Sequence, residues 1–344
     1  MTQLRQDPGT REWVIIAAER AKRPKDFTKA PRAAEDLPPT HDPKCPFCPG
    51  NEGMTPPEVL AYADGPRQPN GPDWKLRVIP NKFAAVSFGG SQERYLDGMF
   101  RSMDGLGSHE VVVETPRHDL SIGTMPVERV QQVLAAYRDR LSALNSDERV
   151  SLVTIFRNHG VGAGTSLVHP HSQIVATPVV PLHVRHRLDA WRDYYDDNGS
   201  CSLCDMLAAE LEAETRVVMQ TDHFAVICPF ASRSPMETLI IPKAHRATLG
   251  TDGEGELADL ARVLSTLMGA FHEAMSDPDY NYVVRTAPSE ELTADYIHWS
   301  VKVVPRLSTP AGFEIGSGMY INATPPEDAA AFLREAIEAK APTA

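Results

Sequence analysis

The residues best suited to chemistry lie in one stretch of the 344-residue sequence, Ser166-Leu-Val-His169-Pro170-His171-Ser-Gln173. The proline between the two histidines fixes its own φ at about −65° and removes one backbone donor, so the local chain is extended and stiff. Side chains alternate along an extended chain, which predicts that His169, His171 and Gln173 point into one space. A pair of surface histidines is the ordinary interpretation. We favour a nucleophilic imidazole, His171, held in place by its neighbours.

A neutral imidazole, whose ordinary pKa is about 6.5, is a good nucleophile toward phosphorus and a good leaving group afterwards. Gln173 can hydrogen-bond a phosphate oxygen, but a carboxamide cannot act as a general acid or base. This pairing favours a covalent nucleotidyl-histidine that waits for a second substrate, rather than rapid hydrolysis. Groups able to neutralise charge on the phosphates are Arg20, Arg23, Asn158, Ser166 and the backbone N–H groups of the glycine turn that ends at Gly164.

The two arginines follow a short strand expected at 13–17. Cations near a strand end usually belong to a solvated loop. The alternative is an anion clamp, in which Arg20 and Arg23 offer bidentate forks to phosphate.

Four of the five cysteines form two C-x-x-C pairs, which in isolation are either redox-active or half of a metal site. The order of features around the first pair is repeated around the second: a strand ending near a histidine, a helix (126–144 and about 254–276), a second strand, and a motif histidine. One supersecondary unit is therefore expected to have been duplicated.

Each half supplies two cysteines and two histidines, the ligand set of a closed tetrahedral zinc site. The expected ligands are Cys45, Cys48, His118 and His169 in the first half, and Cys201, Cys204, His245 and His298 in the second. His109 competes with His118, and His223 with His245. Free core thiols and histidines bonded to the backbone are the alternatives to two zinc ions per chain.

The halves differ where chemistry is expected. The residue two positions after the expected metal ligand is His171 in the first half, after His169, and Ser300 in the second, after His298. The first zinc would orient the nucleophile without touching the substrate, and the second half would lack the reactive group. One functional site per chain follows.

Composition and charge indicate a globular protein and argue against nucleic-acid and membrane partners. The net charge of −12 argues against a nucleic-acid partner, and 42% hydrophobic with 23% charged residues is ordinary for a globular protein. No apolar run reaches membrane-spanning length, and the N-terminus lacks the apolar core of a signal peptide. We expect a cytoplasmic location without membrane partners, where paired cysteines bind metal more readily than they form disulfides.

Five motifs occur together: H-P-H-S-Q, C-P-F-C, Arg20-Ala-Lys-Arg23-Pro, Asn81-x-Phe83 and Gly312-Phe313-Glu314. As a set they resemble the galactose-1-phosphate uridylyltransferase family, the transferase branch of the histidine-triad superfamily, over essentially the whole chain. The resemblance implies an α+β fold of two fused histidine-triad-like domains, each an antiparallel sheet with a packed helix. We place them at 1–178, with the catalytic motif, and 179–344, degenerate at the nucleophile. It also implies a homodimer.

The resemblance further implies a ping-pong exchange of nucleotide sugars and sugar 1-phosphates in galactose metabolism. UDP-glucose would leave UMP on His171 and release glucose 1-phosphate, and galactose 1-phosphate would then take the UMP. By resemblance, the phosphates are bound by Gln173, Ser166, Asn158, Arg20 and Arg23. Asn81 and Phe83 lie along the base and ribose. Glu314 meets the sugar, from this chain or from the partner subunit, and we add Tyr320 to the sugar-binding residues.

Three departures leave the substrate open. The family has an acidic residue where Lys82 stands, a glycine where Ser172 stands, and a histidine of an iron site where Ser300 stands. H-P-H-S-Q and the tail from Gly312 through Tyr320 also resemble the ADP-glucose phosphorylase branch, in which the nucleotide is AMP and the acceptor is inorganic phosphate. A third hypothesis is a zinc-stabilised nucleotide-binding protein without turnover.

Overall fold

The computed structural model of the protein describes residues 1–18, 27 and 37–340. Arg20 and Arg23 lie outside the described residues, so their predicted role stays a prediction. The α-helices are α1 (Val127–Asn145), α2 (Leu182–Asn198), α3 (Ser202–Ala213), α4 (Glu254–Ala274), α5 (Gly312–Ser317) and α6 (Pro326–Lys340). The strands are β1 (Gln3–Gln6), β2 (Trp13–Ile16), β3 (Leu60–Tyr62), β4 (Leu76–Pro80), β5 (Tyr95–Asp97), β6 (Phe100–Ser102), β7 (Ser108–Val113), β8 (Leu152–His159), β9 (His171–Thr177), β10 (Val217–Gln220), β11 (Phe224–Ile227), β12 (Thr238–Pro242), β13 (Tyr280–Arg285), β14 (Ser300–Pro305) and β15 (Tyr320–Asn322).

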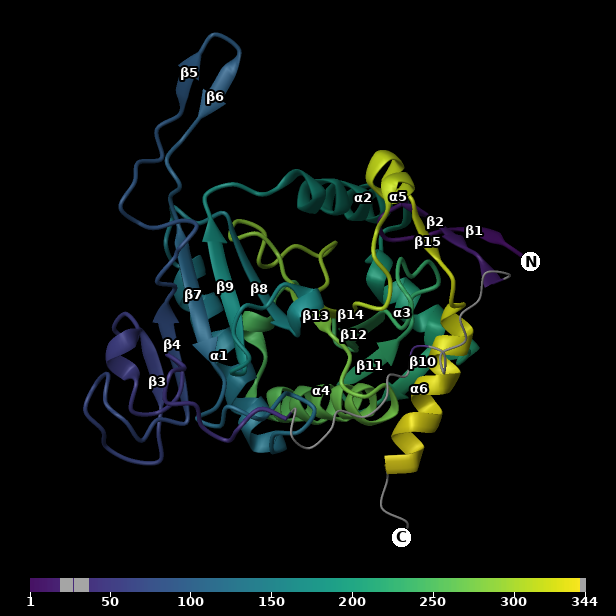
Figure 1. The fold of residues 1–344 in the computed structure, drawn as a ribbon. Helices are drawn as coiled ribbons and strands as arrows, with labels where there is room; N and C mark the ends of the chain where they lie inside the picture. The colour runs from purple at the N-terminus through teal and green to yellow at the C-terminus, as the bar shows by residue number, and fades with distance from the viewer. Residues whose placement is uncertain (19–26, 28–36, 341–344) are drawn as a thin grey trace.

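Ten strands form one antiparallel sheet, in the order β10-β11-β12-β14-β13-β8-β9-β7-β4-β3 (Figure 1). Read outward from the centre, β8-β9-β7-β4-β3 has the same order as β13-β14-β12-β11-β10. The central strands β8 and β13 pair with each other, so two five-stranded units share one continuous sheet. The predicted duplication and the α+β fold of two antiparallel units are confirmed.

One face of the sheet carries the hydrophobic core. In β9, Ser172, Ile174 and Ala176 are fully buried on this face, whereas Gln173 and Val175 are half-buried on the other. The period of two follows from the alternation of side chains along a strand. Helices α1 and α4 pack against each other over the buried face, with apolar residues at helical spacing. Both helices match their predicted ranges to within two residues at each end.

Other elements lie outside the predicted pattern. Helices α2 and α3 join the two halves, and α6 packs on α4. The chain's first strands meet its tail in a small sheet, β1-β2-β15. The β5–β6 hairpin projects from the body (Figure 1). Within the residues that the structure describes, no helix combines the length and apolar character needed to cross a membrane.

Candidate functional site

A cavity of about 330 Å³ opens on the uncovered face of the first half, beside β4, β7 and β9. Its lining includes five residues predicted to act in the site, Asn81, Phe83, Ser166, His171 and Gln173. Apolar groups complete the walls, among them Phe47, Ile79 and Val111. A mainly apolar cavity with a few converging polar groups is the usual form of a small-molecule site.

His171 is the first residue of β9 and is 8% exposed. Its Nδ1 lies 2.8 Å from the carbonyl oxygen of His169, so Nδ1–H donates to that oxygen. The lone pair is then on Nε2, the nitrogen left to attack an electrophile. Burial holds the pKa of His171 below its ordinary value of 6.5, so the imidazole is neutral at pH 7. The Phe47 ring packs against it, with centroids 5.4 Å apart.

The prediction that His169 shares this cavity is wrong. Strand β9 begins only at His171, so the alternation of an extended chain does not extend back to His169. The His169 ring turns instead toward Cys48, with Nδ1 3.5 Å from Sγ. It contacts His171 through its backbone carbonyl, which accepts the Nδ1–H of that residue.

Gln173 is held by a residue whose part sequence reasoning missed. His109 Nε2 lies 2.7 Å from the Gln173 Oε1, and its Nδ1 accepts a hydrogen bond from the Ala85 backbone N–H at 3.1 Å. With Nδ1 as the acceptor, Nε2–H is the donor, and the amide NH₂ of Gln173 remains available to a ligand. His109 is therefore not a metal ligand, which settles its competition with His118.

A buried ion pair lies close to His171. Arg157 of β8 donates from Nε to both carboxylate oxygens of Glu114, at 3.0 and 3.1 Å, and from Nη1 to the Tyr280 hydroxyl at 2.7 Å. Glu114 and Arg157 are 0% and 2% exposed. The pair ties the end of β7 to β8 on either side of β9. No periodicity marks these charges in the sequence, because buried partners pair across strands rather than along the chain.

The glycine turn after β8 is shaped by a carboxylate. Gly160 has φ +82°, and a Cβ there would fall 1.9 Å from Asp279 Oδ1. The backbone N–H of Gly162 donates to Asp279 Oδ2 at 2.6 Å. Among the predicted phosphate ligands, Gly164 ends this turn with φ +90°, and Asn158 accepts a hydrogen bond from Asn281 at 2.8 Å. Neither is among the residues that line the cavity.

The four residues predicted for the first metal site come together. The ligand atoms of Cys45, Cys48, His118 and His169 lie within 4.8 Å of one another, and all four residues are buried. Cys48 Sγ is 3.4 Å from the Nδ1 of His118 and 3.5 Å from that of His169. A tetrahedral ion with Zn–S of about 2.3 Å and Zn–N of about 2.0 Å would separate S and N by about 3.5 Å, so the geometry fits.

The surroundings of these four residues favour metal binding. His169 Nε2–H donates to the Thr115 carbonyl at 2.8 Å, which keeps the lone pair on Nδ1, toward the cluster. Burial raises the pKa of the Cys45 thiol to about 11. A cation is therefore needed to hold that thiol as a thiolate at neutral pH.

The second cluster repeats this design. Cys201, Cys204, His245 and His298 also lie within 4.8 Å, with Cys204 Sγ 3.4 and 3.3 Å from the Nδ1 atoms of the two histidines. His298 Nε2–H donates to the Pro242 carbonyl at 3.0 Å, as His169 does to Thr115. His245, not His223, is the residue in the cluster. The two groups fit two metal ions per chain.

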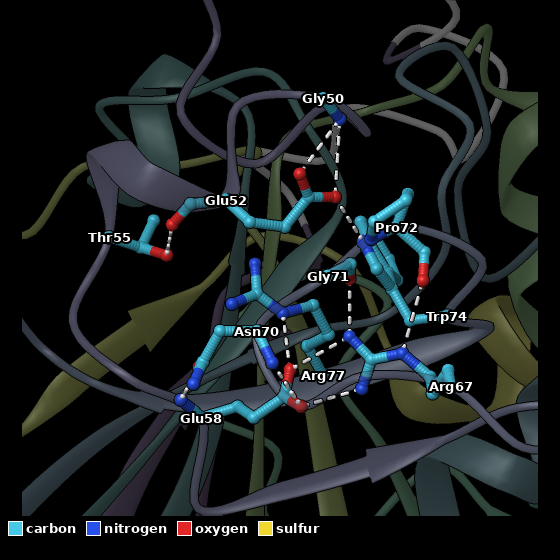
Figure 2. A network of polar contacts seen from close by, with 10 residues as sticks. All are labelled: Gly50, Glu52, Thr55, Glu58, Arg67, Asn70, Gly71, Pro72, Trp74 and Arg77. Atoms are coloured by element: carbon cyan, nitrogen blue, oxygen red, sulfur yellow. Dashed lines mark hydrogen bonds and ion pairs between the residues drawn. The ribbon is translucent and has the colours of Figure 1, made fainter.

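The cysteine loop of the first half is fixed to β4 by a polar network (Figure 2). Glu52 accepts hydrogen bonds from Trp74 Nε1 at 2.8 Å and from the Gly50 backbone N–H at 3.0 Å. Glu58 pairs with Arg67 at 2.6 Å and with the buried Arg77 at 2.9 Å. These contacts place Cys45 and Cys48 beside the cavity wall.

The predicted sugar-binding residues lie elsewhere. Glu314 caps α5 by accepting the Ala311 N–H at 2.9 Å, and Tyr320 lies in β15 with Arg233 over its ring. Neither lines the cavity that holds His171. Their sugar-binding role remains a prediction.

Comparison with known proteins gives the family. Residues 1–181 and 187–307 match the N-terminal and C-terminal domains of galactose-1-phosphate uridyl transferase. The chain is 36% identical to ADP-glucose phosphorylase of Arabidopsis thaliana, over 97% of this chain and 92% of that protein. It is 31% identical to galactose-1-phosphate uridylyltransferase of Thermotoga maritima, over 97% and 98%.

A solved structure of the Arabidopsis ADP-glucose phosphorylase with bound ADP-glucose superposes with a TM-score of 0.81 at 35% identity, covering 97% of this chain and 98% of that one. Matches of this extent, together with the site geometry above, lead to one conclusion. The chain belongs to the galactose-1-phosphate uridylyltransferase family and is a nucleotidyltransferase.

Proposed function

We propose that the protein is a UDP-glucose–hexose-1-phosphate uridylyltransferase of galactose metabolism, acting through a covalent nucleotidyl-histidine on His171 Nε2. The observation that carries the proposal is the hydrogen bond from His171 Nδ1 to the His169 carbonyl at 2.8 Å. It leaves a neutral nitrogen with a free lone pair facing the cavity.

The reaction divides into two displacements at one phosphorus. Nε2 of His171 attacks the α-phosphorus of UDP-glucose, and the bond from that phosphorus to the bridging oxygen breaks. Glucose 1-phosphate leaves with the electron pair. A phosphate oxygen of the incoming hexose 1-phosphate then attacks the same phosphorus, the P–N bond breaks, and the lone pair returns to Nε2.

The neighbouring groups act on the phosphates. The NH₂ of Gln173, oriented by His109, donates to a non-bridging oxygen, and Ser166 lies on the same cavity wall. Asn158, Gly164 and the two arginines complete the predicted phosphate ligands. Gln173 carries no titratable proton, so it does not activate water, and the nucleotidyl group persists until the acceptor binds. Asn81 and Phe83 border the part of the cavity proposed for base and ribose.

We assign zinc to both clusters, because two thiolates and two imidazoles suit it. In the first half, Cys45, Cys48, His118 and His169 would hold the ion. Bound there, zinc supplies rigidity to the chain at His169, whose carbonyl orients the nucleophile. In the second half the ion would be structural.

We further propose a cytoplasmic homodimer in which Glu314 and Tyr320 reach the sugar from the partner subunit. The support is that neither residue lines the cavity of its own chain. Helix α5 also carries exposed apolar side chains beside Glu314: Phe313 is 49% and Ile315 is 79% exposed. The boundary between the two units near residue 178 is part of this proposal.

A second candidate function is that of an ADP-glucose phosphorylase, with AMP on His171 and inorganic phosphate as the acceptor. The identity of 36% to the Arabidopsis enzyme of that name favours it over a match of 31% to a uridylyltransferase. The covalent step is the same in both.

Intact-protein mass spectrometry tests the proposal. The zinc-loaded protein is incubated separately with UDP-glucose and with ADP-glucose, without acceptor. We expect a gain of one UMP per chain in the wild type and none in His171→Ala. His186→Ala, which removes an exposed histidine of α2, should label like the wild type.

The label decides between the functions. AMP in place of UMP would move the protein to the phosphorylase and leave the mechanism standing. Nucleotide binding without any adduct, equal in wild type and His171→Ala, would refute both and support the non-catalytic hypothesis. His171→Ala should keep its metal content, because His171 is not a ligand.

A further inference from the structure

The second half preserves the position of the active site but carries different residues there. Counting from the metal-cluster histidines, Ser300 stands where His171 stands, and Lys302 where Gln173 stands. Arg285 of β13 pairs with Ser300, and the register of β8 with β9, continued by two residues, places Asn158 opposite His171. His171, Gln173 and Asn158 of the first half therefore correspond to Ser300, Lys302 and Arg285 of the second. An imidazole and two amides are replaced by a hydroxyl and two cations.

This face of the second half also has its own cavity. It measures about 220 Å³ and lies over β8, β13 and β14, under the start of α2. Four of its lining residues bear or can bear positive charge: His183, Arg187, Arg285 and Lys302. The exposed His183 lies in the first turn of α2, and Arg187 is 8% exposed. The cavity is separate from that of His171, and the two share no lining residue.

Of these cations, Lys302 forms an ion pair, whereas Arg187 and Arg285 form none within the described part of the chain. Lys302 pairs with Glu237 at 2.6 Å. Arg187 Nε is buried without a hydrogen-bond partner, and its guanidinium lies over the Trp191 ring, 5.3 Å from the centroid. Among the described residues, no carboxylate lies within ion-pair distance of Arg187 or Arg285. The charges of Glu237 and Asp7 act on Arg285 from beyond ion-pair distance, and Asp7 Oδ1 accepts the backbone N–H groups of Gly9 and Thr10.

A cation that is buried, like Arg187, or half-buried, like Arg285, is costly outside an ion pair. Burial, followed by the charge of Arg285, lowers the pKa of Arg187 to about 9. Burial also lowers the pKa of Arg285 itself. Buried charges in native proteins are paired, and a guanidinium kept without a partner at a cavity wall indicates that the partner is a ligand.

We propose that this cavity is a second, non-catalytic anion site, in which Arg187 and Arg285 bind the phosphate group of a small molecule. Two guanidinium groups match the two charges of a phosphate dianion and offer it planar, bidentate donors. Lys302 lies beside them, held by Glu237. Ser300 replaces the histidine, and its hydroxyl, which has no hydrogen-bond partner among the described residues to act as a base, is a far weaker nucleophile toward phosphorus than an imidazole.

The size of the cavity limits the ligand. At about 220 Å³ it is two-thirds of the His171 cavity of about 330 Å³. It suits inorganic phosphate or a small phosphate monoester better than a nucleotide sugar. The shared chemistry is the phosphate dianion.

Thermal unfolding of the full-length, zinc-loaded protein tests the proposal, in phosphate-free buffer and with added potassium phosphate at matched ionic strength. Phosphate should raise the melting temperature of the wild type. Arg285→Met should melt higher than the wild type without phosphate, because a half-buried cation outside any ion pair has been removed. It should lose the phosphate-induced shift, and its dissociation constant for phosphate by calorimetry should rise about tenfold or more.

Two variants serve as controls. Arg140→Met removes a cation of similar burial that is paired with Glu110 at 2.7 Å, so it should melt lower than the wild type and keep the phosphate response. Gln173→Ala alters the His171 cavity and should also keep the response. Parallel titrations with glycerol 3-phosphate distinguish a monoester site from a site for phosphate alone.

The sign of the change at Arg285 is decisive. If Arg285→Met melts lower than the wild type without phosphate, or shows the wild-type response to phosphate, another group neutralises the arginines and the proposal is wrong. A response lost in Gln173→Ala but retained in Arg285→Met would assign phosphate binding to the His171 cavity and also refute it. The sign of the melting change at Arg285 without phosphate does not depend on which nucleotide His171 accepts.

Discussion

Replacing Cys48 by serine separates the structural role of the first metal site from its role in catalysis. Cys48 is 1% exposed, and its Sγ lies 3.4 and 3.5 Å from the Nδ1 atoms of His118 and His169. A serine hydroxyl is not ionised at neutral pH and is a poor zinc ligand. We expect Cys48→Ser to retain one metal ion per chain where the wild type holds two.

The stability change follows from mass action. A site saturated at 100 times its dissociation constant stabilises the folded state by about 2.7 kcal/mol. With an unfolding entropy of about 2.1 cal/mol/K per residue over the 344-residue chain, this corresponds to about 4 °C in melting temperature. Cys48→Ser should forfeit a shift of about this size, and chelation of the wild type should reproduce it.

The catalytic change follows from the hydrogen bond between His171 Nδ1 and the His169 carbonyl. If the metal no longer fixes His169, the nucleophile loses its orientation, and a displacement of about 1 Å costs about 100-fold in rate. Cys204→Ser removes the metal of the second half, where Ser300 stands in place of the nucleophile, and should leave the rate of His171 labelling near that of the wild type.

The assay is metal analysis by plasma mass spectrometry, with melting and single-turnover labelling on the same samples. Cys228→Ser is the matched control, since Cys228 is also 1% exposed and belongs to neither cluster. It should keep two metal ions. Two metal ions in Cys48→Ser, or equal metal loss in Cys228→Ser, would refute the first ligand assignment. Equal loss of labelling in Cys48→Ser and Cys204→Ser would refute the link between the first metal and the nucleophile.

Two further predictions concern the surroundings of His171. Glu114→Gln leaves the buried Arg157 without its ion-pair partner and should lower the free energy of unfolding by about 3–5 kcal/mol in urea denaturation. The control is Asp193→Asn, which breaks an ion pair whose partners are both more than half exposed and should change the free energy of unfolding by at most about 1 kcal/mol. Equal effects of the two substitutions would contradict the prediction. Burial lowers the pKa of His171 below 6.5, so the rate of His171 labelling should be constant from pH 8 down to about 6.5. Below that pH the rate should fall, because the imidazole becomes protonated. A labelling rate that already declines between pH 8 and 7 would contradict the prediction.

Much of this protein could be predicted from local patterns. The helices at 127–145 and 254–274 follow from apolar residues at helical spacing, because that spacing alone places one face against a core. The two Cys₂His₂ sets follow from a repeated order of residue types, since a closed metal site needs particular ligands whatever the fold around it. The assignment of His171 as the nucleophile, which stays a proposal, comes from the same kind of pattern, a histidine in one half and a serine in the other.

Tertiary structure decided what depends on pairing between distant segments. It turned His169 away from the cavity, joined His109 to Gln173, and buried Glu114 against Arg157, contacts between residues that carry no shared pattern in the chain. It also joined the two halves through β8 and β13 into one sheet, and brought Arg187 of α2 and Arg285 of β13 together at the wall of one cavity. Ligand types are a property of the residues themselves, whereas burial and charge balance are properties of the neighbours that folding brings together.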